Sequence, residues 1–353
     1  MQLISASVPK RNAPSGVQDG QNELVFTDAK EGIAAQFSAF PGGKIALVSN
    51  GGSLPLFREY ALSPRALSLV SEGDALPLFS LPEGVRCVIA AGGRETLLMA
   101  RCFAAVRRVP CVLVPSEASL AGASEARASV LVGGERAMHR LAPARILCDR
   151  TRLLPTLGEA YARLLTARLS SFEGRALAAF GMGEERPAFA LPEAAFEPVL
   201  RASLALPAPL QEGEGFVLAA RLCADGEEQP FWRAYLQLTA LYAAFFRFGR
   251  PRRSFVPDYS LRASRSGSDL PAEVPSPGQY ALRAMALERI RGRFAEEAAA
   301  LAEERPAEAE KVSSLSPRPV SLRGGSTFRL KYLPEYAPGG LACVLRDFGL
   351  MEW

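Results

Sequence analysis

The chain has 353 residues, of which 48% are hydrophobic and 22% are charged. This balance is typical of a folded globular protein and excludes a disordered or fibrous one. The formal net charge is +4, and the basic residues, nearly all arginine, are scattered among acidic residues. A scattered charge of this size argues against a nucleic-acid-binding surface, so we expect no nucleic acid partner.

Neither a signal peptide nor a membrane span is indicated. The first residues lack a sufficiently long apolar stretch, and the longest apolar run, from Ala234 to Phe246, is short and contains Gln237 and Thr239. The six cysteines form no CxxC pair and lie mostly in apolar segments. We therefore predict a cytoplasmic protein with reduced, buried thiols and no membrane partner.

The first 150 residues alternate between strand and helix patterns. Continuous apolar runs are typical of parallel strands that are covered on both faces. They occur at residues 44–49, 66–71, 87–93 and 111–116, with helix-like segments at 54–62 and 95–108. This alternation predicts a doubly wound α/β domain with a mostly parallel sheet over residues 1–150. The segments 128–134 and 144–149 are predicted to form a hairpin that closes the domain.

Residues 151–353 are predicted to form an α-helical domain. Leucine and alanine recur with helical spacing over 153–180, 197–206, 215–224, 231–249 and 278–304. Loops are expected at 248–278 and 305–327, and a last short helix within 338–353. The aromatic residues of the fourth helix recur at helical spacing and are most simply core; they are Phe231, Trp232, Tyr235, Tyr242, Phe245 and Phe246.

The stretch CVIAAGGRETLLMAR, residues 87–101, combines a buried strand, two glycines and a helix start. Such a turn can place backbone N–H groups and a helix N-terminus against a phosphate. It can equally let a strand and a helix pack closely, because Gly92 and Gly93 carry no Cβ. Arg94 and Glu95 stand where a phosphate-binding turn usually has glycine and a small hydroxyl residue.

Three passages resemble the superfamily of iron-containing alcohol dehydrogenases, glycerol and glycerol-1-phosphate dehydrogenases, and dehydroquinate synthase. VIAAGGRETLLMAR is similar to the family's strand–GGG[ST]–x-x-D-x-A-K turn, and VPCVLVPSEASLAGASEARASV to its P-x-I-x-V-P-T strand and loop. APARILCDRTRLLPTLGEAYARLLTARLSSFE looks like the family's passage into its helical domain. The resemblance implies a dehydroquinate synthase-like fold, with a Rossmann-like nucleotide-binding domain at 1–150, a helical metal and substrate domain at 151–353, and a cleft between them.

Active members of this superfamily hold a divalent metal with an Asp and two His, and the metal polarises the substrate oxygen. The resemblance places Tyr161 at the Asp position and puts Phe216 and Phe231 where the histidines belong. The whole chain contains one histidine, His139. One histidine cannot supply two ligands, so the sequence predicts that this metal site is absent. The polyol-contacting Asp of the family is also replaced, by Ala121.

The resemblance implies a cofactor site made of Asn50, Gly92, Gly93, Arg94, Ser116 and Ser119. The Cβ of Arg94 would crowd a pyrophosphate and the carboxylate of Glu95 would repel it, although the guanidinium of Arg94 could restore positive charge. Ser116 and Ser119 could bond a ribose or phosphate, or could merely cap the loop. We therefore expect NAD or NADP to bind weakly at most, as a nucleotide or small anionic ligand.

Two functions follow. The first is a pseudoenzyme, a catalytically degenerate relative of the polyol dehydrogenases that keeps weak nucleotide or anion binding in the interdomain cleft. The second is a metal-independent NAD(P)-linked oxidoreductase acting on a small polyol or phosphorylated polyol, with Glu159, Tyr161 and Arg163 filling the cleft. Tyr161 could serve as a general acid, but packing is the simpler role because Leu165 occupies the place of a partner lysine. The sequence leaves open whether the chain forms a homodimer.

Overall fold

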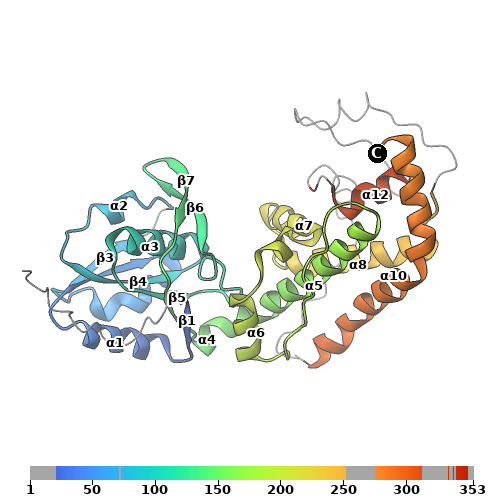
Figure 1. Cartoon of the computed structure of the whole chain (residues 1–353). Coiled ribbons are helices and arrows are strands. Elements are labelled where there is room, and N and C mark those ends of the chain that lie inside the picture. Colours follow the sequence, from blue (N-terminus) through green and yellow to red (C-terminus); the bar gives the residue numbers. More distant parts are fainter. Residues whose placement is uncertain are drawn as a thin grey trace, which may run out of the picture. The chain divides into compact units, whose positions relative to one another are not determined.

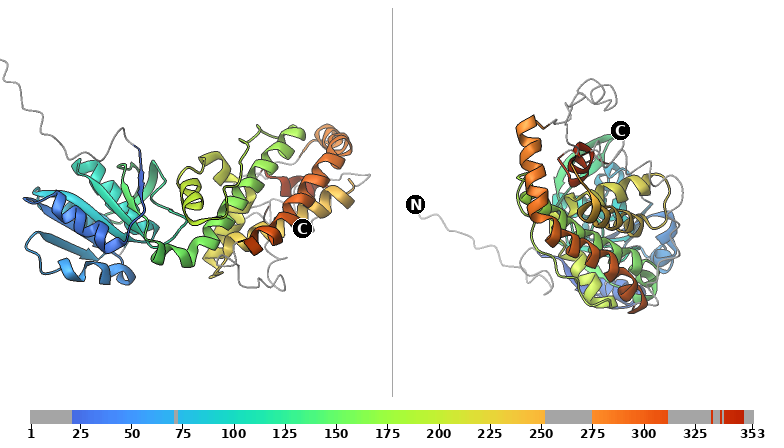
Figure 2. Two further views of the ribbon diagram at one scale, coloured as in Figure 1. Left: turned by 90° about the horizontal axis from the view of Figure 1, so that it is seen from below. Right: turned by 90° about the vertical axis from the view of Figure 1, so that its right-hand side faces the viewer.

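The computed structural model describes residues 21–70, 73–251, 275–311, 333, 337 and 339–348. The chain divides into two compact units, Met1–Leu153 and Leu154–Trp353, which we describe separately (Figures 1 and 2).

The first unit contains a six-stranded parallel sheet with strand order β1-β8-β5-β4-β2-β3. Its strands are β1 (Glu23–Val25), β2 (Lys44–Ser49), β3 (Ala66–Val70), β4 (Val85–Gly92), β5 (Cys111–Pro115) and β8 (Arg145–Leu147). Its helices are α1 (Ala29–Ala39), α2 (Leu76–Phe79), α3 (Arg94–Arg107) and α4 (Arg150–Leu153), with a 3₁₀ helix η1 (Gly51–Tyr60). All four apolar runs of the sequence are strands, as predicted.

Helices cover both faces of this sheet, which confirms the doubly wound class (Figure 1). Alternate strand residues such as Ile45 and Ile89 form one buried cluster with Ile33 and Phe37 of α1 and with Phe57 of η1. Because successive side chains of a strand point to opposite faces, the residues between them face the other side, where α3 contacts β2, β4 and β5. Both faces of the sheet are covered and shielded from water, which explains why these strands are continuously apolar.

One strand of the hairpin differs from the prediction. β6 (Arg127–Val132) pairs in antiparallel fashion with β7 (Glu135–Arg140) through the turn Gly133–Gly134, whose φ angles of +63° and +84° favour glycine. The segment 144–149, expected to pair with β6, instead contributes β8 to the parallel sheet between β1 and β5. β7 is polar and mostly exposed, so it has no apolar pattern from which a strand could be predicted. The apolar β8 is suited to a central position in the sheet.

The second unit is helical throughout its described residues, as predicted. Its elements are η2 (Leu154–Thr156), α5 (Leu157–Ala179), α6 (Phe196–Leu204), η3 (Ala208–Glu212), α7 (Glu214–Ala224), α8 (Pro230–Phe248), α10 (Pro277–Lys311) and α12 (Leu341–Asp347). The loop expected at 305–327 was wrong in its first residues, because the run AEAEK is rich in helix formers and continues α10 to Lys311. Residues 312–327 of that loop, and most of the loop expected at 248–278, lie outside the described residues.

The core of this unit surrounds α5, which is buried along nearly its whole length. It contacts α6, α7, α8, α10 and α12. Glycine allows the closest of these approaches: a Cβ on Gly213, at the start of α7, would lie 2.4 Å from Oγ of Ser170. The ring of Phe172 packs against Tyr242 and Phe246 of α8, at centroid distances of 5.9 Å. The aromatic residues expected in the core are buried there, apart from the half-buried Phe231.

The apolar run from Ala234 to Phe246 lies inside α8. In the part of the chain that the structure describes, no helix combines the length and hydropathy needed to cross a membrane. Five cysteines are buried free thiols, but Cys223 is exposed on the outer side of α7, contrary to the expectation for that residue.

Arg101 binds the loop after β5, and its substitution tests how much this contact stabilises the first unit. It is a buried residue of α3 whose guanidinium donates to the carbonyl oxygens of Ala142 and Gly122, both at 2.8 Å. We expect Arg101→Met to lower the free energy of unfolding by about 2–4 kcal/mol, because the buried carbonyl of Gly122 and the half-buried carbonyl of Ala142 lose their partner. Urea unfolding measures this, and Arg86→Met on the exposed side of β4 is the control. An equal effect of the two substitutions would contradict this role.

Candidate functional site

The predicted cofactor residues lie where three adjacent parallel strands end. Asn50 follows β2, Gly92 ends β4 and Ser116 follows β5. The sheet order reverses between β2 and β4, since β3 lies beyond β2 on one side and β5 beyond β4 on the other. In open α/β sheets, the crevice at such a reversal is the usual place for a ligand.

The structure brings Asn50 and the glycine turn into contact. Gly92 has φ +151°, and a Cβ there would lie 3.0 Å from Cγ of Asn50 and 3.2 Å from Oγ1 of Thr96. The backbone N–H of Ser116 donates to the carbonyl of Gly92 at 3.0 Å. Gly92 is therefore required for close packing of strand, helix and Asn50, whether or not a ligand binds.

Asn50 has a structural role in addition. Its side-chain oxygen accepts a hydrogen bond from the backbone N–H of Ser53 at 3.0 Å and thereby caps η1. This oxygen is already bonded at the place where the resemblance expects a group that reads a ribose.

Arg94 is held by a carboxylate rather than directed to an anion. Its Nε and Nη2 donate to the two carboxylate oxygens of Glu125, both at 2.9 Å, and its Nη1 lies 3.1 Å from Oε1 of Glu95. Such a two-pronged pair is the geometry in which Arg binds a carboxylate most strongly. The positive charge that could have compensated for Glu95 is therefore balanced within the protein.

The two serines differ in their surroundings. The Oγ of Ser116 lies 3.8 Å from where a Cβ on Gly93 would be, so it borders the turn directly. Oγ of Ser119 interacts instead with the carboxylate of Glu117 at 3.4 Å and accepts from the N–H of Ala121 at 3.5 Å. These contacts of Ser119 fit the loop-capping alternative.

Acidic side chains surround the turn. Glu95 lies in the first turn of α3, a Cβ on Gly93 would lie 4.0 Å from Oε1 of Glu117, and Glu125 pairs with Arg94. The N-terminus of a helix favours one negative charge, and Glu95 already supplies it. The carboxylates present here oppose tight binding of the diphosphate of a dinucleotide.

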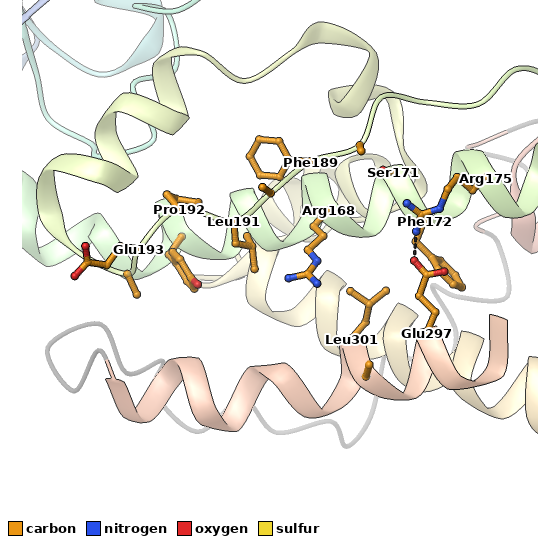
Figure 3. Close-up of a pocket in the computed structure, with 15 residues that line it drawn as sticks. Arg168, Ser171, Phe172, Arg175, Phe189, Leu191, Pro192, Glu193, Glu297 and Leu301 are labelled. Carbon is orange, nitrogen blue, oxygen red and sulfur yellow. Dashed lines mark hydrogen bonds and ion pairs between the residues drawn. The ribbon is translucent and has the colours of Figure 1, made fainter. Parts of the chain in front are cut away.

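In the helical unit, the three residues of the alternative hypothesis do not converge. Oε1 of Glu159 accepts the N–H of Phe231 at 2.7 Å at the start of α8, while Arg163 donates to Oε1 of Gln211 at 2.6 Å. Tyr161 lines a cavity together with Arg168 (Figure 3). Residues two apart on a helix point in nearly opposite directions, so Tyr161 lies on the side of α5 away from the other two.

Glu159 nevertheless has unusual electrostatics. Burial raises the pKa of its carboxyl to about 7, although its hydrogen bond from Phe231 acts in the other direction. Its Oε2 is buried and has no hydrogen-bond partner among the described residues.

The positions that the resemblance assigns to metal ligands are apolar contacts. The rings of Phe216 and Phe231 meet edge to face at 5.4 Å, and the guanidinium of Arg163 lies 5.9 Å from the Phe216 ring. His139 lies on β7 of the first unit, opposite Ala128. No group of three or more His, Cys, Asp or Glu side chains in the described ranges could hold a metal. These residues do not fit the family's metal.

Sequence reasoning missed a buried pair of carboxyls, Glu173 and Glu214. The hydroxyl of Tyr242 is bonded to both, at 2.9 Å to Glu173. Glu173 also accepts the N–H of Glu214 at 2.9 Å, and Glu214 accepts that of Ala342 at 2.8 Å. No local pattern singled out this pair, because α5 contains Glu159 and three arginines besides Glu173, and Glu214 is simply the first residue of α7.

Burial favours a shared proton in this pair, and the guanidinium of Arg186, 3.4 Å from Oε2 of Glu173, opposes it. One hydroxyl hydrogen cannot serve two carboxylates, so the geometry suits a carboxyl that donates to the oxygen of Tyr242. Burial raises the pKa of Glu173 to about 8, with the Glu214 charge adding to it, and burial raises that of Glu214 to about 7. Both carboxyls are therefore enclosed by bonds within the unit and serve its packing.

The fold resembles several solved dehydrogenase structures. An iron-containing alcohol dehydrogenase from Corynebacterium glutamicum is 13% identical, with a TM-score of 0.45, over 93% of this chain and 97% of that one. A glycerol dehydrogenase from Schizosaccharomyces pombe is 12% identical, with a TM-score of 0.44, over 87% of this chain and 94% of that one. No protein-family model matches the chain, and no curated protein does.

The carboxyl pair predicts a pH-dependent stability. Because the folded-state pKa values lie above the ordinary 4.5, the folded state keeps a proton that the unfolded state releases. The free energy of unfolding should therefore fall by about 2–4 kcal/mol as pH rises from about 5 to about 8. Urea unfolding at each pH measures this.

Glu214→Gln is the matched variant, since its amide can accept from Ala342 and donate to Tyr242 without titrating. We expect the free energy of unfolding of this variant to fall less as pH rises. The contribution of Glu159, whose pKa is also raised, should remain. Identical pH profiles of wild type and variant would contradict the assignment.

Proposed function

We propose that this chain is a pseudoenzyme, a non-catalytic relative of the glycerol-1-phosphate and polyol dehydrogenases that acts by binding rather than by chemistry. The observation that carries the proposal is that charged groups of both units, among them the predicted Glu159 and Arg94, are used structurally. Glu159 binds the start of α8, Glu173 and Glu214 bind Tyr242, and Arg94 binds Glu125. A group enclosed in such contacts is unsuited to move a substrate proton, because it must first be released from them.

The ligand of the first unit would be a nucleotide or small anion, bound weakly at the turn after β4. The open N-terminus of α3 supports this, since Gly93 provides no side-chain cap. Against tight binding stand the carboxylates of Glu95, Glu117 and Glu125. We place the protein in the cytoplasm, as the sequence indicated, and leave homodimer formation to measurement.

A metal-independent NAD(P)-linked oxidoreductase acting on a small or phosphorylated polyol is the second candidate. The pKa of Glu159, raised to about 7 by burial, is the observation in its favour, since a general acid works best near the ambient pH. Its weakness is geometric: Tyr161 lies on the side of α5 away from Glu159 and Arg163, and Arg163 donates to Gln211. Polyol-dependent reduction of NAD or NADP that is lost in Glu159→Gln would favour this candidate over the first.

Nucleotide titration tests the role of the acidic turn. We expect neither NAD nor NADP to bind the wild-type protein with micromolar affinity in calorimetry. The triple variant Arg94→Gly, Glu95→Ser, Glu125→Gln should bind at least about tenfold more tightly, because N–H groups become accessible and two carboxylates disappear.

Glu125 is included because Arg94→Gly alone would leave its charge unpaired beside the phosphate. Glu83→Gln, at an exposed position before β4, controls for a change in net charge. Micromolar binding by the wild type that the triple variant leaves unchanged would refute the proposed effect of the turn.

Metal content tests the loss of the dehydrogenase chemistry. After purification without chelators, we expect elemental analysis to find far less than one zinc or iron per chain, because the one histidine and the Tyr161, Phe216 and Phe231 side chains do not form a ligand set. Stoichiometric zinc or iron that persists through dialysis would overturn the proposal.

A further inference from the structure

The helical unit contains a cavity of about 620 Å³ that the proposed function does not use (Figure 3). Its walls are α5, the extended segment 188–194 and α10, all within one unit. The volume lies in the range of small-molecule sites.

One part of the cavity is apolar. Phe189, Leu191 and Pro192 form the wall contributed by the extended segment, and Leu301 faces them from α10 (Figure 3). Hydrocarbon is the natural occupant of such a surface, because its transfer out of water is favourable.

The other part is formed by three polar residues of α5. Arg168, Ser171 and Arg175 are spaced three and four residues apart and therefore project from one face of the helix. Figure 3 shows Arg168 extending from α5 toward α10, and Glu193 at the opposite end of the cavity from Arg175. Ser171 and Arg175 thus lie toward one end of the cavity, and Arg168 lies between them and Leu191 (Figure 3).

Polar atoms in this wall lack partners. Ser171 is 2% exposed, and its Oγ has no hydrogen-bond partner in the described part of the chain. Nε of Arg175 is likewise buried and unpartnered, although another nitrogen of the same guanidinium pairs with Glu297. A buried hydroxyl without a partner costs about 1–3 kcal/mol, and a ligand group that reached the Ser171 hydroxyl would recover this cost.

The charges indicate the sign of that ligand. Burial lowers the pKa of Arg175, and the positive charges of Arg293 and Arg168 add to this effect, opposed by Glu185. Glu297 pairs with Arg175 at this end, and Arg168 also has an interaction within the protein. An anion would relieve the repulsion among the guanidinium groups, and Arg binds carboxylate and phosphate oxygens with matching geometry.

We propose that this cavity binds a small organic anion, with a carboxylate or phosphate monoester group beside Arg168, Ser171 and Arg175 and an apolar body against Phe189, Leu191 and Leu301. The site is separate from the turn after β4, and the inference does not depend on the proposed function. Binding here would hold α5, the extended segment and α10 together, so the ligand would also stabilise the helical unit.

Calorimetric titration of the full chain tests the proposal with three probes that share an eight-carbon chain: octanoate, octyl phosphate and 1-octanol. We expect one equivalent of octanoate or octyl phosphate to bind at least about tenfold more tightly than 1-octanol. The tighter of the two anions identifies the head group. Equal affinities for 1-octanol and both anions would overturn the proposal, as would the absence of saturable binding.

Two variants locate the site. Arg168→Met keeps the length of the side chain and should lower the affinity for the anion at least about tenfold. Ser171→Ala should lower this affinity about threefold to tenfold. Arg221→Met, at an exposed position of α7, should leave affinity unchanged.

Ser171→Ala removes only an unpartnered oxygen, so it should fold as the wild type does, which circular dichroism verifies. Unchanged anion affinity in both pocket variants would place the anion elsewhere and refute the site.

Discussion

The helical unit depends on the burial of α5 on all sides. A helix enclosed in this way must satisfy its polar side chains within the protein, because water cannot reach them. Glu159 does so at the N-terminus of α8, and Glu173 through Tyr242 and a shared proton. This constraint explains why carboxyls with raised pKa values occur here without forming a catalytic site: perturbed pKa values mark burial as well as chemistry.

The same helix explains the cavity. Where α5 faces the extended segment and α10, Ser171 and Arg175 retain atoms without a hydrogen-bond partner among the described residues. At the turn after β4, Glu125 and Glu95 together engage the guanidinium of Arg94. The turn and the cavity therefore differ in how far carboxylates within the protein engage their arginine side chains. The turn has the architecture of an anion site but an acidic surface, whereas the cavity lacks a recognised motif but has cationic groups around open space.

Much of the fold follows from hydrophobic pattern alone. The four buried strands and the helices after residue 150 were predicted because their side chains must be buried on two faces or on one helical stripe. β7 was not predicted because its residues are polar. β8 was assigned to the wrong partner because strand pairing depends on contacts between residues that are far apart in the sequence. Of the candidate site, the meeting of Asn50, Gly92 and Ser116 was foreseeable, since the carboxyl ends of neighbouring parallel strands share an edge.

The sequence by itself determined the class of each unit and the lack of a histidine pair, since both depend only on which residue types occur and at what spacing. Only the tertiary structure decided which charges are compensated. The Arg94–Glu125 pair joins residues of α3 and a loop far along the chain, and Tyr242 reaches two carboxyls from separate helices. The cavity beside Ser171 likewise exists only where three distant segments pack. Such contacts depend on distances across the fold, for which no local pattern of residues provides a signal.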